Sequence, residues 1–111
     1  MRYLVNAFSL NMVPETAILV KMPITQAEFC AAVNEAINAI GHETTANLIN
    51  TLCNARLTAN RIAIKAGYGE EIYVIQVMTR LEEGKVLSLS ELMELLSKGL
   101  IKFYKVTVQK P

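Results

Sequence analysis

The sequence predicts an α/β fold, built as a single small domain with a mixed sheet of about five strands flanked by about three helices. Three observations predict it. The chain has 111 residues, which fits one compact domain. Its residues are 52% hydrophobic and 19% charged, which is ample for a folded core. Short β-rich runs alternate with longer apolar patterns at helical spacing, which favours a sheet covered by helices.

Five runs have the composition of strands. Residues 71–78 form the most strongly β-type run, so we expect them to be the central strand. Residues 16–22 lack clear alternation, which predicts a strand covered on both faces. The lysines within residues 101–108 indicate a partly exposed strand, placed at an edge of the sheet. The two remaining expected strands are residues 3–8 and 61–65.

Capping residues mark the helices. Thr25 with Glu28, and Ser88 with Glu91, form two capping boxes, in which each side chain binds the other residue's backbone N–H. Gly99 ends the helix that the second box begins. The three helices are expected over residues 26–39, 42–54 and 89–98.

Composition excludes several classes of protein. A net charge of +1 and the lack of tryptophan do not fit a partner that is a long nucleic acid. Cys30 and Cys53 match no zinc or redox spacing, and each lies in an apolar helical pattern, so we expect two buried thiols. No run suits a membrane span or a signal peptide. We therefore expect a soluble cytoplasmic protein that needs no metal or cofactor and binds no membrane.

His42 is the candidate for proton chemistry. It is the only histidine in the chain and follows Gly41 at the expected start of a helix. A helix start presents free N–H groups and a partial positive charge, which suit a phosphate. That positive end disfavours a charged imidazole, whereas a bound phosphodiester favours it. The pattern predicts a general acid that becomes competent when an anionic ligand binds.

RNA cleavage without a metal is a reaction that such a group would serve. The ribose 2′-OH attacks its own adjacent phosphate, and His42 protonates the leaving 5′-oxygen, which typically contributes about 10²–10⁴-fold. Arg80 could stabilise negative charge on the transition state. The product would carry a 2′,3′-cyclic phosphate, and DNA would be inert because it lacks the nucleophile.

Each of these features also has a simpler explanation. A lone histidine beside a helix start is more often a cap or a surface residue than a catalyst. The polar stretch from Asn6 to Asn11 fits ordinary turn chemistry. The charged run from Arg80 to Lys85 is more often a solvated turn than a functional loop. Residue types and spacing alone therefore favour no single function.

Three blocks considered together are far more specific than any one of them. They are Tyr3 to Met12 (YLVNAFSLNM), Ile40 to Asn50 (beginning IGHETT) and Arg80 to Lys85 (RLEEGK). In these blocks the chain resembles the viral ring nuclease family, anti-CRISPR proteins of archaeal viruses and bacteriophages with relatives in some type III CRISPR loci. The order and spacing of the blocks extend the resemblance over nearly the whole chain.

The resemblance implies a metal-independent homodimer that cleaves cyclic tetra-adenylate, the second messenger of type III CRISPR complexes, to linear di-adenylate with 2′,3′-cyclic phosphate ends. His42 would be the general acid. Arg80 and Glu83 would belong to a loop that closes over the ligand, with Arg80 near the scissile phosphate and Glu83 supporting the protonated imidazole. The implied ligand contacts are Asn6, Ser9, Asn11, Thr44, Thr45, Arg61 and Gln76.

Two other hypotheses stay open at this point. One is a non-catalytic protein that sequesters or senses the cyclic nucleotide. The other is a structural or interaction protein with no nucleotide ligand. Replacement of His42 by alanine separates the first from an enzyme, because a protein that only sequesters the ligand would keep its action.

Overall fold

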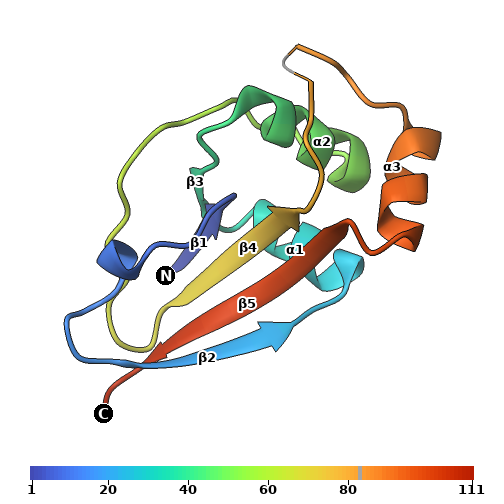
Figure 1. The fold of residues 1–111 in the computed structure, drawn as a ribbon. Coiled ribbons are helices and arrows are strands. Elements are labelled where there is room, and N and C mark those ends of the chain that lie inside the picture. The colour runs from blue at the N-terminus through green and yellow to red at the C-terminus, as the bar shows by residue number, and fades with distance from the viewer. Residues whose placement is uncertain (83) are drawn as a thin grey trace.

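The computed structural model describes residues 1–82 and 84–111, and over these residues a five-stranded mixed sheet carries three helices (Figure 1). The predicted fold class is confirmed. The strands are β1 (Arg2–Val5), β2 (Ile18–Pro23), β3 (Ile37–Ala39), β4 (Glu71–Val77) and β5 (Ile101–Gln109). The helices are α1 (Gln26–Val33), α2 (Glu43–Cys53) and α3 (Leu89–Ser97), with one 3-10 turn, η1 (Leu10–Met12).

The sheet has the order β2-β5-β4-β1-β3, so β4 is the central strand, as its composition predicts. β1 is parallel to both β3 and β4, whereas β5 is antiparallel to β4 and to β2. The sheet is therefore divided into a parallel half, β3-β1-β4, and an antiparallel half, β4-β5-β2. This division decides where the polar loops meet.

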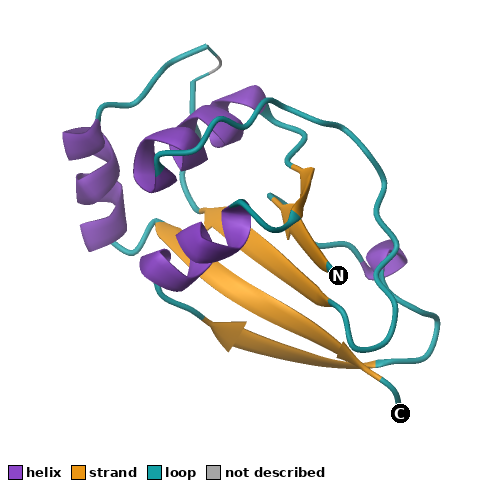
Figure 2. Ribbon diagram, turned by 180° about the vertical axis from the view of Figure 1, so that it is seen from behind, coloured by secondary structure: helices purple, strands orange, loops and turns teal. Residues whose placement is uncertain are grey.

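The helices pack on one face of the sheet, as the reverse view shows (Figure 2). Phe29 of α1, Ile49 of α2 and Leu92 of α3 are completely buried there, against a sheet surface that includes Ile75 and Phe103. The rings of Phe29 and Phe103 lie 4.8 Å apart between centroids. Burial of each such side chain stabilises the fold by about 1.5–3 kcal/mol.

The opposite face of the sheet is covered by irregular chain instead of helices. Ile72 and Val74 of β4 form a second buried cluster with Ile64 and Ala66 of the long connection between α2 and β4. The backbone N–H of Ala66 donates to the carbonyl of Met12 at 2.7 Å, which joins this connection to the turn after β1. The core therefore has two layers, one on each face.

α1 is shorter than its apolar pattern predicts. Both capping boxes are present, but α1 ends at Val33, and Ile37–Ala39 pairs with β1 as the short edge strand β3. The apolar residues at 33, 37 and 40 are spaced for a helix, yet β-branched Ile37 and Ile40 also suit a strand. Pairing with β1 satisfies backbone groups that would otherwise form an open edge.

The strand expected at residues 61–65 is not present. This stretch is extended chain without a strand neighbour, in which Ile64 is buried and Ile62 is 45% exposed. The alternation of Ile62 and Ile64 therefore does not report a buried face here, and a strand also needs a partner for its hydrogen bonds. β3 supplies the fifth strand in its place.

Two expectations about exposure in the sheet are also wrong. β2 is an edge strand with Ile18 49% and Met22 50% exposed, and not a strand covered on both faces. β5 lies inside the sheet, between β2 and β4. Its Lys105 is accommodated because the ammonium group pairs with the Glu71 carboxylate of β4 at 3.7 Å. Lys102 and Lys105 point to opposite faces of the sheet, so lysines in this strand do not mark an edge.

Cys30 and Cys53 are joined in a disulfide between α1 and the end of α2, which corrects the expectation of two free buried thiols. The two helices pack side by side, so cysteines separated by 23 residues in the sequence meet in the fold. Within the described residues, no helix combines the length and apolar character that a membrane crossing needs.

Candidate functional site

The polar segments converge where the three parallel strands end. Asn6 follows β1, Arg80 follows β4 after a short turn, and His42 begins the helix that comes after β3. In open α/β sheets, ligands bind in the crevice outside the carboxyl ends of the strands. A hollow of about 800 Å³ lies there, lined by Asn6, His42, Thr45, Ile75, Val77, Thr79, Arg80, Leu81 and Glu82.

His42 is the N-cap residue of α2, which confirms its expected place at a helix start. Its backbone is extended, with φ −115° and ψ 120°, and its side chain makes no capping hydrogen bond. The imidazole is exposed, and the Thr45 hydroxyl lies beside it, with Oγ1 3.4 Å from Nδ1. The histidine is thus at the positive end of an eleven-residue helix, with its ring free to meet a ligand.

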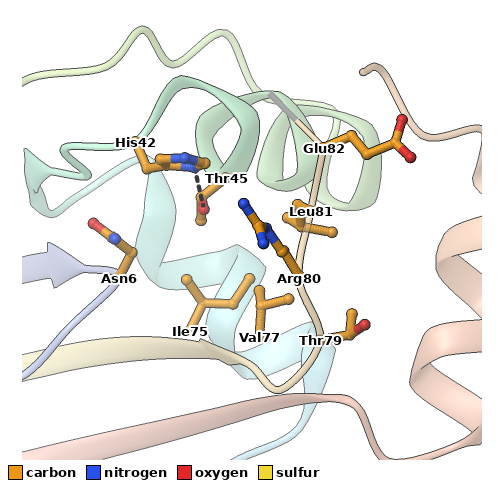
Figure 3. A pocket seen from close by; sticks show the side chains of 9 residues that line it. All are labelled: Asn6, His42, Thr45, Ile75, Val77, Thr79, Arg80, Leu81 and Glu82. Atoms are coloured by element: carbon orange, nitrogen blue, oxygen red, sulfur yellow. Dashed lines mark hydrogen bonds between the residues drawn. The ribbon is translucent and has the colours of Figure 1, made fainter. Parts of the chain in front are cut away.

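Arg80 reaches into the same hollow from the opposite side. Its guanidinium group extends toward His42 and Thr45, whereas the neighbouring Glu82 carboxylate points away from them (Figure 3). Arg80 is exposed. A planar guanidinium binds phosphate oxygens through paired hydrogen bonds, so Arg80 offers a cation to an anion in the hollow.

Asn6 and Thr45 complete the set of predicted residues that meet at the hollow. The Asn6 side chain accepts a hydrogen bond from the backbone N–H of Gly41 at 3.0 Å. Thr45 is only 5% exposed and lies on the first turn of α2. Four of the predicted site residues, from three parts of the chain distant in sequence, are therefore brought together.

Thr44, Arg61 and Gln76 lie beside this hollow and not in it. Thr44 and Arg61 line a second hollow of about 500 Å³, which shares His42 with the first. Gln76 lines a third hollow of about 570 Å³, which shares Asn6. A ligand larger than the main hollow would therefore reach these residues by extending past His42 or past Asn6.

Ser9 and Asn11 are placed farther from the imidazole. The Ser9 hydroxyl caps η1 by accepting the backbone N–H of Asn11 at 3.4 Å. The Asn11 carbonyl accepts from the Lys65 ammonium at 2.8 Å, and Asn11 lines another hollow of about 540 Å³. In this structure both residues have the turn chemistry that was their simpler explanation. Glu83 lies outside the described residues.

Five lining residues were not predicted from the sequence. They are the apolar or small side chains of Ile75, Val77, Thr79 and Leu81, together with Glu82. The sequence signal that points to them is their position, because they lie at the end of the central strand β4 and on either side of Arg80. Ile75, Val77 and Leu81 add apolar surface beside the polar side chains of the hollow.

The arrangement brings together side chains of the kinds that phosphate chemistry uses. An imidazole, a guanidinium and an amide face one solvent-open space, at a helix start. A proton donor for the leaving oxygen and a cation beside the phosphoryl oxygens are two groups that promote transesterification of a phosphodiester. Among the residues that the structure describes, no three His, Cys, Asp or Glu side chains gather as metal ligands.

Comparison with known proteins gives relatives over nearly the whole chain. The STIV B116-like family model matches residues 2–105. The ORF116 protein of Acidianus filamentous virus 1 is 39% identical over 96% of this chain and 94% of its own length. Protein 26 of Sulfolobus islandicus filamentous virus is 30% identical over 98% and 95%. The solved structure of B116 of Sulfolobus turreted icosahedral virus is similar with a TM-score of 0.89 and 39% identity, covering 96% of this chain and 97% of B116.

Proposed function

The chain belongs to the STIV B116-like family of viral proteins, and from this premise we propose that it is a ring nuclease that cleaves cyclic tetra-adenylate. Its action would antagonise type III CRISPR signalling, because loss of the messenger silences the nucleases that it activates. The observation that carries the proposal is that His42 and Arg80 face one hollow from opposite sides. The resemblance of the three sequence blocks supplies the ligand.

The proposed reaction is an internal transesterification. The 2′-OH of one ribose gives up its proton to water as its oxygen forms a bond to the adjacent phosphorus, and the bond from phosphorus to the 5′-oxygen breaks. His42 gives its proton to that leaving oxygen, and the Arg80 guanidinium stabilises charge on the phosphoryl oxygens. The products are linear di-adenylates ending in 2′,3′-cyclic phosphates. Glu83 is assigned from the resemblance alone to the support of the protonated imidazole.

We further propose that the active form is a homodimer. An isologous pair presents two copies of His42 symmetrically, and a cyclic tetranucleotide can share that two-fold symmetry. Exposed apolar side chains on the edge strand β2 support an association, because monomers rarely leave such groups together on their surface. Sedimentation at several concentrations should give the mass of two chains, and a single-chain mass at all of them would overturn this part.

The decisive experiment incubates the purified protein with cyclic tetra-adenylate in excess EDTA and resolves the products by mass. His42→Ala is the test variant, and Thr25→Ala, at the start of α1, is its matched control. Linear di-adenylate with cyclic phosphate from the wild type and from Thr25→Ala, but not from His42→Ala, supports the proposal. Intact ligand with the wild type overturns the catalytic proposal.

If the ligand stays intact, a thermal shift measurement distinguishes a protein that binds the messenger from one with another role. Because a ligand that binds only the native state raises the melting temperature, an upward shift with intact ligand indicates a non-catalytic protein that sequesters or senses the messenger. No shift with intact ligand indicates a protein with another role.

A further inference from the structure

The residue directly before His42 is held on both sides by side chains from distant parts of the chain. The N–H of Gly41 donates to Oδ1 of Asn6 at 3.0 Å, and its carbonyl accepts from Nε of Arg61 at 2.8 Å. These partners are 35 and 20 positions away in sequence. The carbonyl of Gly41 belongs to the peptide group that joins it to His42, so Arg61 restrains the plane from which the histidine projects.

Further hydrogen bonds join the residues just before Gly41 to the residues just before Arg61. The backbone N–H of Asn60 donates to the carbonyl of Ile40 at 2.7 Å, and its side-chain amide donates to the carbonyl of Asn38 at 2.8 Å. In return, the Asn38 amide donates to the carbonyl of Thr58 at 2.8 Å. Residues 38–41 and 58–61 are thus joined mostly by hydrogen bonds from side chains, and not by the backbone hydrogen bonds of a regular sheet.

Glycine at position 41 allows Arg61 to approach the backbone closely. A Cβ atom built there would lie 3.2 Å from Cγ of Arg61, which is tighter than ordinary packing. Without that atom, the aliphatic part of Arg61 lies against the backbone and its Nε reaches the carbonyl. The glycine therefore serves the contact with Arg61.

We infer that Asn6 and Arg61, supported by Asn38 and Asn60, are positioning residues that fix the backbone from which His42 acts. The inference rests on the proposed role of His42 as the acid. Among the described residues, the hydrogen-bond neighbour of the exposed imidazole is Thr45 at 3.4 Å, so within this part of the chain the backbone does most to set its direction. A displacement of about 1 Å in a reacting group can cost about 10²-fold in rate.

This inference differs from a direct role in ligand binding, and conservative variants separate the two. Arg61→Lys keeps the positive charge but removes Nε, so a positioning role predicts a fall in kcat of about 10- to 100-fold with KM changed less than about threefold. A role as a cation for the ligand predicts the reverse, with kcat kept and KM raised. The second result would overturn the inference.

Asn6 offers the complementary substitution. Asn6→Ala removes the acceptor for the Gly41 N–H and should lower kcat by about 10- to 100-fold, whereas Asn6→Asp keeps an acceptor and should restore kcat to within about threefold of the wild type. Its carboxylate would repel a phosphate, so KM should rise. If Asp is as slow as Ala, the acceptor is not what matters and the inference fails.

A measurement that needs no substrate tests the same contacts. Hydrogen exchange by NMR should show the Gly41 amide at least about tenfold less protected in Asn6→Ala than in the wild type. The resonance of the single histidine ring should shift in both Asn6→Ala and Arg61→Lys. Unchanged protection and an unchanged resonance would overturn the inference. Intact cyclic tetra-adenylate with the wild type would overturn the proposed function, and these spectra would then decide the inference alone.

Asn50→Ala is the matched control at the other end of α2. Its side chain bridges to Leu57 in a similar way, accepting from the backbone N–H at 2.7 Å and donating to the carbonyl at 2.8 Å. Its loss should lower stability but leave kcat and Gly41 protection as in the wild type. An equal fall of kcat in Asn50→Ala would show general loosening of the helix and would overturn the inference.

Discussion

The start of α2 differs from the starts of the other two helices. α1 and α3 begin with complete capping boxes, in which Thr25 pairs with Glu28 and Ser88 pairs with Glu91. α2 begins with His42, whose side chain makes no capping hydrogen bond. Two helix starts are thus built for stability, and the third leaves its first turn without that support. The difference indicates that His42 is not at this position to stabilise the helix.

The largest expected effect comes from converting the α2 start into the type found in α1. His42→Ser should supply a side-chain cap and raise the free energy of unfolding by about 0.5–1 kcal/mol, because His42 already has the extended backbone of an N-cap. Cleavage of cyclic tetra-adenylate should fall by about 10²–10⁴-fold. Chemical denaturation and a cleavage assay check both, and a variant that is less stable and fully active would contradict the comparison.

Arg80 tests the other side of the hollow. Arg80→Ala should lower the rate by about 10²–10³-fold, since a fixed cation toward the phosphoryl oxygens is lost. Stability should change by less than about 0.5 kcal/mol because the side chain is exposed. Lysine at this position should give an intermediate rate. Rates equal to the wild type in single-turnover assays would remove Arg80 from the site.

Removal of the disulfide tests whether α2 is stabilised by a covalent bond at its C-terminal end instead of by a cap at its start. Replacing both Cys30 and Cys53 by alanine should lower the free energy of unfolding by about 3 kcal/mol, from the loop that the bond closes over a separation of 23 residues. Cleavage by the folded variant should persist, because His42 is at the opposite end of the helix. Equal denaturation curves with and without reductant would argue against this anchor.

Loss of a capping box should lower the free energy of unfolding by less than loss of the disulfide. Thr25→Ala and Ser88→Ala should each lower the free energy of unfolding by about 1 kcal/mol. His42→Ala should lower the free energy of unfolding far less, since it removes no capping hydrogen bond. Parallel urea titrations of the three variants measure the difference. Equal losses in all three would mean that the α2 start is supported like the others.

The smallest expected effect is the pH dependence of the α3 start. A hydrogen bond from the Ser88 backbone N–H, joined by contacts with the Ser88 hydroxyl and Lys85, lowers the pKa of Glu91 below its ordinary value of 4.5. A lowered folded pKa means that this contribution to stability is complete above 4.5 and is lost as pH falls through the folded value. The melting temperatures of wild type and Glu91→Gln should therefore converge between pH 5 and pH 3. A gap that widens toward acid would contradict the assignment.

Much of the site was predictable because its signals are local. A histidine after a glycine and before an apolar periodic run indicates a helix start, and the helix ends close to the expected residue 54, where Asn54 has φ 53° in the left-handed conformation. The order of strands and helices then predicts that polar segments after parallel strands meet at one edge. The sequence could not show which side chains face the hollow and which form hydrogen bonds with the backbone, because an arginine or an asparagine can do either.

Several errors share one physical cause. Whether residues 37–39 extend a helix or add a strand depends on the edge of β1, which is remote in sequence. Whether residues 61–65 become a strand depends on a partner that the fold does not supply. The pairing of Cys30 with Cys53 depends on how α1 packs beside α2. Pattern and composition report burial and local propensity, but pairing is decided by neighbours.

The sequence by itself determined the α/β class, the central strand, the helix starts and the place of His42, since each depends on capping, periodicity or turn chemistry within a few residues. The tertiary structure alone decided the edge strand β3, the disulfide, and the contacts of Asn6 and Arg61 with Gly41. Those features join segments that are distant along the chain, and their formation depends on the packing of the whole domain.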